Sequence, residues 1–297
     1  MTTLAEVWAV VITHRDVDRA VRCACSLGLP VDRVIIVANL PPPAGGTEPW
    51  TTVSPPTPQG YAANINLGVA QAPAGTRWLL LLNDDVVFEP QTLERLLTAA
   101  CSERTVAAIT PALYGVDRRP QVVAFRHPTM ASEIAGVLSG PEFLRRALRK
   151  GDSVMPSERG VTIEDWVLGA AVVVRAAAFA AVGGFDERYF MYSEDTQFGL
   201  DLQRAGWRSA VLHDAWALHV GAVSTNDPQW GEMLGASRRR YLRNNWSRLR
   251  FAALCALWLV AQVWNAAYLL TTSIHDPSRR NMSVAHARAQ LCHPPWR

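Results

Sequence analysis

Short apolar runs alternate with amphipathic segments along the first part of the chain. The runs are dominated by Val, Ile, Leu and Ala, which predicts buried strands at residues 7–13, 32–39, 78–82 and 106–114. Apolar residues at helical spacing predict helices at 16–27, at 61–71 and from Pro90 to about Ser102, since Pro is favoured in the first helical turn. Strands that alternate with helices predict an α/β fold with a mostly parallel central sheet and right-handed crossovers.

The second part of the chain carries the same two patterns. A short strand is expected near 53–55, and another at 172–174 before a helix at 175–182 that two glycines close. Ser193 is a candidate N-cap for a helix that runs to Ala205. Residues 207–224 supply one or two final strands, and 143–152 have the pattern of a short basic helix.

Composition restricts the classes of function. With 297 residues, the chain is long enough for one large α/β domain or a domain with an appendage. A net charge of +3 is too small to indicate binding of a polyanion, so we expect no nucleic-acid partner. Five scattered cysteines without a CxxC pair indicate reduced thiols in a cytosolic compartment. No basic segment precedes the first apolar run, so we expect no signal peptide.

The C-terminal region differs from the rest. The strongly basic stretch SRRRYLRNNWSRLR precedes 22 residues without a charge, 251–272. That length suits a membrane span, although Gln262 and Asn265 weaken this interpretation. Trp258 and Trp264 favour a helix that lies at a membrane interface, and a buried core helix is the alternative. Because basic residues flank both ends, we expect peripheral attachment to the inner face of the cell membrane, with the protein cytoplasmic.

We expect a catalytic domain at 1–230, divided near residue 113, and a helical region at 231–297.

Polar side chains stand where the predicted strands end. Thr13, Asn39 and the stretch 83–85 follow three different strands, and ligands bind at the carboxyl ends of strands in such sheets. The adjacent acids at 84 and 85 repel each other, so a cation, a basic side chain or water must compensate; an ordinary solvated turn is the alternative. Glu194 and Asp195 are a second acidic pair, which also suits the first turn of any helix.

Four stretches together resemble glycosyltransferase family 2, the inverting enzymes of GT-A fold. They are VWAVVITHR, GYAANINLG, LLLLNDDVVFEP and LGAAVVVRAAAFAAVGGFDERYFMYSEDTQFGLDLQRAG. The last is especially similar to bacterial rhamnosyltransferases that extend a lipid-linked sugar and to related galactofuranosyltransferases. The resemblance covers residues 7–224.

The resemblance implies a GT-A nucleotide-diphospho-sugar transferase fold and a site in three parts. Asp85 and His219 would hold Mn²⁺ or Mg²⁺, and Asp195, with Glu194 beside it, would be the general base. The donor side would be formed by Thr13, His14, Arg15, Asn39, Gly60, Asn64, Asn83 and Asp84. The acceptor side would include Trp166 and Gly169. The reaction would move a sugar from a nucleoside-diphosphate donor, with dTDP-rhamnose first and UDP-sugars next, to a glycan, polyprenyl-linked or protein acceptor.

The chain departs from the family pattern at several positions. Ala38 stands where similar enzymes carry an Asp that meets the pyrimidine base, and His14 replaces the usual Tyr. Gln197 and Asp201 occupy the places of an Asp and an Arg. These departures leave open a sugar-nucleotide-binding protein without catalysis. A nucleotidyltransferase is a third hypothesis, but no Gly-rich phosphate loop follows the first strand.

Overall fold

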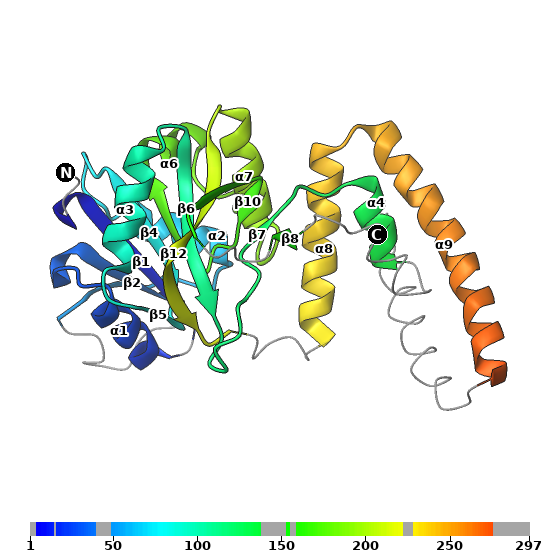
Figure 1. Cartoon of the computed structure of the whole chain (residues 1–297), viewed down its shortest axis with the longest axis horizontal. Coiled ribbons are helices and arrows are strands. Elements are labelled where there is room, and N and C mark those ends of the chain that lie inside the picture. The colour runs from blue at the N-terminus through cyan, green and yellow to red at the C-terminus, as the bar shows by residue number, and fades with distance from the viewer. Residues whose placement is uncertain are drawn as a thin grey trace. The chain divides into compact units, whose positions relative to one another are not determined.

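The structure is a computed structural model that describes residues 4–14, 16–39, 49–137, 153–154, 159–221 and 228–275. The chain divides into two compact units (Figure 1): residues 1–127 with 153–225, and residues 128–152 with 226–297. The predicted basic helix at 143–152 and the predicted donor residue Arg15 lie outside the described residues. The predicted boundaries at 113 and 230 stay a prediction.

Unit 1 is built on a central sheet. Its strands are β1 (Val7–Thr13), β2 (Val34–Ala38), β3 (Thr51–Val53), β4 (Trp78–Asn83), β5 (Val86–Phe88), β6 (Val106–Tyr114), β9 (Val161–Glu164), β11 (Ala171–Arg175) and β12 (Arg208–His219). Within the described residues these nine strands follow the order β3–β2–β1–β4–β11–β6–β12–β5, with β9 paired to β12. The predicted final strands are one long strand, β12, with a register shift between Leu212 and Trp216.

The sheet is mixed. The predicted parallel pairs are present between β1, β2, β3 and β4 and between β6 and β12. Strands β5, β9 and β11 join antiparallel. Strand β11 runs against β4 and β6 because the connection from β6, over residues 115–170, ends at the same end of the sheet at which it began.

Helices cover the strands of unit 1. These are α1 (Val17–Ser26), α2 (Tyr61–Val69), α3 (Thr92–Ser102), α6 (Ala176–Val182) and α7 (Glu194–Arg204). Central strands β1, β4 and β6 are buried almost throughout, which explains their continuous apolar runs. A small sheet of β7 (Ala124–Phe125), β8 (Ser153–Val154) and β10 (Trp166–Val167) lies in the same unit.

One predicted helix start is wrong, and a second is confirmed in position but lacks the expected capping bond. Helix α3 begins at Thr92 rather than Pro90, because Gln91 has a left-handed backbone with φ of 64°. Ser193 does precede α7, but its φ is also 64° and its side chain makes no capping hydrogen bond. Both turns use a positive φ at a residue other than glycine, which the sequence does not signal.

Unit 2 contains α4 (Met130–Val137), α8 (Pro228–Asn245) and α9 (Arg248–His275). Arg238 on α8 forms an ion pair with Glu133 on α4, and α9 contacts both of the other helices. Among the described residues, no helix has the length and apolar character that a membrane span requires.

We predict that Gly68→Ala destabilises the protein by about 1–3 kcal/mol, a typical loss for overpacking. A Cβ atom at Gly68 would lie 2.3 Å from Cγ1 of Val10 and 2.9 Å from Cγ2 of Val37, where α2 packs on the sheet. The free energy of unfolding in urea, followed by fluorescence, measures this loss.

Gly231→Ala is the matched control, because an added Cβ there meets nothing within 4 Å. Alanine favours a helix by up to about 1 kcal/mol over glycine, so this variant should be as stable as the wild type or slightly more so. Equal stability of the two variants would show that the α2 contact tolerates a methyl group.

Candidate active site

The carboxyl ends of three strands lie side by side. Thr13 is in register with Ala38 on β2, and Ile12 is in register with Asn83 on β4. The polar residues that follow these strands therefore meet at one edge of the sheet, as the sequence predicts. The backbone N–H of Asn39 also donates to the carbonyl of Thr13, at 2.9 Å.

Asp84 is tied to β1 and α1. Its Oδ2 accepts a hydrogen bond of 2.6 Å from Oγ1 of Thr13, and its Oδ1 lies 3.2 Å from Nη2 of Arg19. Burial raises the pKa of Asp84, an effect that Asp85 reinforces and that Thr13 and Arg19 only partly offset. A second positive charge near this carboxyl would therefore be favourable.

Asp85 faces β12. Its Oδ2 accepts the backbone N–H of Gly221 at 3.0 Å and lies 3.2 Å from Nη2 of Arg19. Its Oδ1 lies 3.4 Å from Nε2 of His219. Burial alone would raise the pKa of Asp85, but His219, Arg19 and the Gly221 N–H together outweigh it and lower that pKa. Asp85 is thus held as the carboxylate.

Gln121 fixes the tautomer of His219. Its Nε2 donates to the backbone carbonyl of His219 at 3.0 Å, and a carbonyl can only accept. Oε1 of Gln121 therefore faces Nδ1 of His219, at 2.7 Å, and accepts its proton. In the protonated ring, Nε2 therefore carries the proton that faces Oδ1 of Asp85, and in the neutral ring Nε2 offers a lone pair that a cation can bind. Metal-binding histidines are oriented by this kind of outer hydrogen bond.

These residues fit a divalent cation. Among the described residues, the buried Oδ1 of Asp85 has no hydrogen-bond partner, and it faces a nitrogen with a free lone pair. Two electron-pair donors in such a position are stabilised by a cation. No group of three or more His, Cys, Asp or Glu side chains in the described part of the chain could bind a metal by itself. Mn²⁺ or Mg²⁺ would take its remaining ligands from water and a bound anion.

The loop before α2 joins the predicted donor residues. Asn39 donates from Nδ2 to the carbonyl of Gln59 at 2.9 Å and accepts the Gln59 N–H at 2.7 Å. The same Nδ2 lies 3.0 Å from Nδ1 of His14. Asn64 is buried and also donates to the Gln59 carbonyl, at 3.2 Å. Sequence reasoning missed Gln59, which bonds through its backbone and so leaves no residue-type signal.

The first turn of α2 fixes two further loops. Gly60 is required by close packing, since a Cβ there would lie 2.1 Å from the carbonyl oxygen of Phe190. Tyr61 donates its backbone N–H to the same carbonyl at 2.8 Å, and its hydroxyl donates to the carbonyl of Gly169. Gly60 and Asn64 thus shape the loop in the structure, and contact of either with a donor stays a prediction.

Asp195 and Glu194 form the second acidic pair at the start of α7. Oδ1 of Asp195 accepts the N–H of Thr196 at 2.8 Å, and the N–H of Gly169 also donates to this carboxylate. Burial raises the pKa of Asp195 to about 6 and, with the charge of Asp195 adding to it, the pKa of Glu194 to about 8. Near pH 7 the burial of both acids therefore favours one proton shared by the pair.

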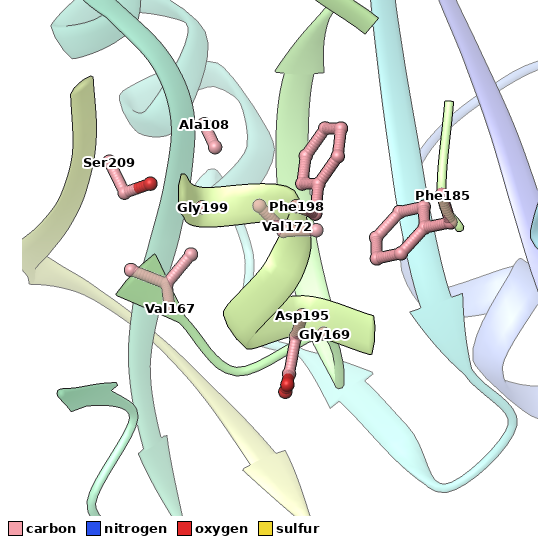
Figure 2. A pocket seen from close by; sticks show the side chains of 9 residues that line it. All are labelled: Ala108, Val167, Gly169, Val172, Phe185, Asp195, Phe198, Gly199 and Ser209. Atoms are coloured by element: carbon pink, nitrogen blue, oxygen red, sulfur yellow. The ribbon is translucent and has the colours of Figure 1, made fainter. Parts of the chain in front are cut away.

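Figure 2 shows a small pocket below α7, with Asp195 at one end. The carboxylate points away from the rings of Phe185 and Phe198, which line the apolar part. Gly169 lies beside Asp195 in the same view.

Backbone contacts of the two residues before β11 connect the two acidic pairs. Gly169, which donates to Asp195, directly precedes Ala170. The carbonyl of Ala170 accepts the N–H of Asn83 at 2.9 Å, and Asp84 follows. Both pairs therefore border the start of β11 at one edge of the sheet. That Asp195 and Asp85 face one cleft stays a prediction.

Trp166 lies on the small sheet. Its ring stacks on Phe125 with the centroids 4.3 Å apart, and its Nε1 donates to the carbonyl of Arg126 at 3.1 Å. Gly199 of α7 packs against it, since an added Cβ would lie 2.3 Å from Cβ of Trp166. Trp166 remains partly exposed beside the helix that carries Asp195.

Gln197 and Asp201 form a hydrogen-bonded pair on α7. Nε2 of Gln197 donates to both carboxylate oxygens of Asp201, each at 2.9 Å, and Arg204 lies 3.2 Å from the same acid. Oε1 of Gln197 accepts from the hydroxyl of Tyr189 at 3.2 Å. Similar enzymes carry an Asp at the position of Gln197 and an Arg at the position of Asp201. Here the acid stands at the second position, and Gln197 donates to it.

Comparison with known proteins identifies relatives of this chain. Residues 78–286 match the family described as Glycosyl transferase family group 2. The N-acetylglucosaminyl-diphospho-decaprenol L-rhamnosyltransferase of Mycobacterium tuberculosis is 34% identical over 248 residues, which cover 77% of this chain and 78% of that protein. Rhamnosyltransferase WbbL of Escherichia coli is 29% identical over 54% of this chain and 60% of its own length.

A solved structure extends the comparison to the fold. The mannosyltransferase PcManGT from Pyrobaculum calidifontis, in complex with GDP-Man and Mn²⁺, superposes with a TM-score of 0.54. It is 13% identical and the match covers 98% of this chain and 87% of that one. At this identity the likeness is one of fold.

Proposed function

This chain belongs to glycosyl transferase family group 2, and we propose that it transfers rhamnose from dTDP-rhamnose to a saccharide carried on a polyprenyl diphosphate. The chain is a glycosyltransferase of GT-A fold, which sets aside the nucleotidyltransferase and inactive-binder hypotheses. The proposal rests on the 34% identity with the mycobacterial protein, whose name states both the sugar and the lipid-linked acceptor.

The donor side is proposed at the ends of β1, β2 and β4. Thr13, Asn39 and Asn83 border it, and the loop at Gln59 closes one side through its bonds to Asn39. Ala38 carries no carboxylate, so the nucleotide base must be recognised by other groups here. His14, which is exposed beside Asn39, is placed to contribute.

Asp85 and His219 would hold the metal ion. When bound, Mn²⁺ or Mg²⁺ would stabilise the negative charge of the departing nucleoside diphosphate. Gln121 presents the lone pair of His219, and the N–H of Gly221 fixes the second oxygen of Asp85. The protein residues thus keep their ligand atoms oriented at low cost when the donor arrives.

Asp195 is proposed as the general base of a single displacement with inversion. Its carboxylate would take the proton from the acceptor hydroxyl as that oxygen attacks the anomeric carbon. The N–H groups of Thr196 and Gly169 hold the carboxylate in place. Glu194 stays protonated near pH 7, because burial raises its pKa, so no second negative charge develops beside the base. Trp166 and Gly169 would border the acceptor.

Helix α9 is proposed to lie on the membrane. Its inward face contains Leu254, Trp258 and Ala261, which are buried. Its outward face exposes large apolar side chains: Leu257, Leu259, Val260, Val263 and Trp264. Such a face, next to the Arg-rich end of α8, suits the interface of an anionic bilayer. Membrane attachment would raise the effective concentration of a lipid-linked acceptor.

We predict that Asp195→Asn lowers turnover by about 10²–10⁴-fold, the usual contribution of a general base. The assay measures dTDP released from dTDP-rhamnose with Mn²⁺ and a polyprenyl-diphosphate-linked N-acetylglucosamine, and includes UDP-sugars as competing donors. Binding of dTDP should be unchanged, because Asp195 faces the acceptor side.

Asp18→Asn is the control, since Asp18 is the exposed second residue of α1, as Asp195 is the second residue of α7. It should retain full activity. An active Asp195→Asn enzyme would disprove the base assignment. Turnover with UDP-sugars alone would disprove the donor assignment while leaving the base in place.

The raised pKa of Asp195 predicts a pH dependence of kcat/KM. The base must be ionised, so the rate should fall about tenfold per pH unit below pH 6 and level off above it. An aspartate with an ordinary pKa would keep its rate down to about pH 4. Initial rates between pH 5 and 8, at low acceptor concentration, test this.

Protonation of the metal ligands would also make kcat/KM fall at low pH. The pH at which that fall begins would then move lower as the Mn²⁺ concentration increases. Repeating the profile at two saturating Mn²⁺ concentrations separates these causes. The prediction for Asp195 is contradicted if kcat/KM at pH 5 equals its value at pH 8. It is also contradicted if the pH of the fall changes with the Mn²⁺ concentration.

We expect the protein to sediment with vesicles of anionic lipid, and less so in high salt, because salt screens surface charge. Replacing both Val260 and Val263 with Asp should abolish this binding without unfolding the chain, since both side chains are exposed. Val116→Asp, at another exposed valine, is the control and should bind as the wild type does. Vesicle binding that survives the double change would exclude this face of α9.

A further inference from the structure

Arg19, which has no role in the reaction proposed above, lies across the two acids at the end of β4. Its Nη2 is 3.2 Å from Oδ1 of Asp84 and 3.2 Å from Oδ2 of Asp85. A single guanidinium nitrogen therefore bridges both carboxylates, and its one positive charge offsets half of their combined negative charge. The arginine side chain is 33% exposed and the two acids 16% and 14%, so Arg19 covers the acids on their solvent side.

The backbone of Arg19 is fixed while its head group can move. Its N–H donates to Oδ1 of the N-cap residue Asp16 at 2.9 Å. Asp16 is held in turn by Thr13, whose Oγ1 accepts the Asp16 N–H at 3.2 Å and lies 2.9 Å from the Asp16 carbonyl oxygen. The guanidinium stands on a long side chain that is one-third exposed. It can change partners without any movement of α1.

The present position of Arg19 is unfavourable once a divalent cation is bound. A cation between Asp85 and His219 would lie beside the guanidinium, and two positive charges would then repel each other across one carboxylate, with Arg19 at Oδ2 and the cation at Oδ1. The donor brings a diphosphate to this edge of the sheet at the same time. The planar fork of Arg suits phosphate oxygens, and the N-terminal turn of α1 adds a favourable dipole.

We propose that Arg19 exchanges partners when the donor binds. In the free enzyme it bridges Asp84 and Asp85, and in the donor complex it pairs with the diphosphate while the metal takes Asp85. This inference rests on the metal and donor of the proposed function. It makes the metal bind weakly to the free enzyme and more tightly with the nucleotide, and the coupling is reciprocal.

The test measures Mn²⁺ binding to the full chain, from the electron paramagnetic resonance signal of free Mn²⁺, with and without dTDP. Without nucleotide, Arg19→Gln should bind Mn²⁺ about 3–10-fold more tightly than the wild type, within the usual range of coupling between sites. At saturating Mn²⁺ the same variant should bind dTDP about tenfold more weakly, because a charged hydrogen-bond donor to phosphate is lost.

Two variants serve as controls. Arg22→Gln, at an exposed position one turn along α1, should match the wild type in both measurements. Arg19→Lys keeps the positive charge and should restore the weak Mn²⁺ binding of the free enzyme. Tighter metal binding is a gain that misfolding would not produce.

The outcomes separate this inference from the proposed function. Unchanged or weaker Mn²⁺ binding by Arg19→Gln, with a wild type that does bind Mn²⁺, overturns the competition. Tighter Mn²⁺ binding with unchanged dTDP affinity overturns the transfer to the diphosphate. A wild type that binds no Mn²⁺ even with dTDP would instead refute the metal assignment of the proposed function, and the exchange with it.

Discussion

Two adjacent carboxylates at the end of a buried strand repel each other, and the site is organised around their compensation. Trp78 to Leu82 are buried, so Asp84 and Asp85 emerge where solvent stabilises charge only in part. Three elements supply partners: Thr13 from β1, Arg19 from α1 and His219 from β12. Even so, the pKa of Asp84 stays raised, because these partners do not offset its burial. A further cation near these acids would therefore be favourable, which is the basis of the proposed metal site.

The antiparallel direction of β11 connects this acidic pair to Asp195, the proposed base. Had β11 been parallel, Gly169 and Ala170 would lie at the opposite edge of the sheet, away from Asn83. Instead the backbone of Ala170 pairs with Asn83, and that of Gly169 supports Asp195. The hydroxyl of Tyr61 binds the Gly169 carbonyl as well, so the start of α2 is fixed to the same junction. The backbone at Gly169 and Ala170 thus connects the proposed donor-side groups to the proposed acceptor-side groups, and it restricts their movement relative to each other.

Sequence reasoning found the features that depend on local pattern and missed those that depend on distant partners. Strand ends with polar residues follow from hydrophobic runs, which made Asp85 recognisable as a candidate. Arg19 and Gln121 were not singled out. A long polar side chain on a helix or in an irregular segment can reach several partners, and the sequence pattern does not indicate which one it contacts. The start of α3 was misplaced because Gln91 adopts a positive φ that its residue type does not announce. The fold could be read from pattern, whereas the neutralisation of charge required the structure.

The departure at Gln197 and Asp201 lies on the helix that carries the proposed base, and its contacts bear on that role. The contact from residue 197 to residue 201 is kept, with the carboxylate now one turn further from the start of α7. An aspartate at 197 would add a third negative charge near Glu194 and Asp195, both of which already have raised pKa values. Glutamine keeps the bond to Tyr189 without that charge, because its amide accepts from the hydroxyl and donates to Asp201. The exchange therefore preserves the mechanical support of the helix while it lowers the electrostatic cost of ionising Asp195, which is compatible with a functional base.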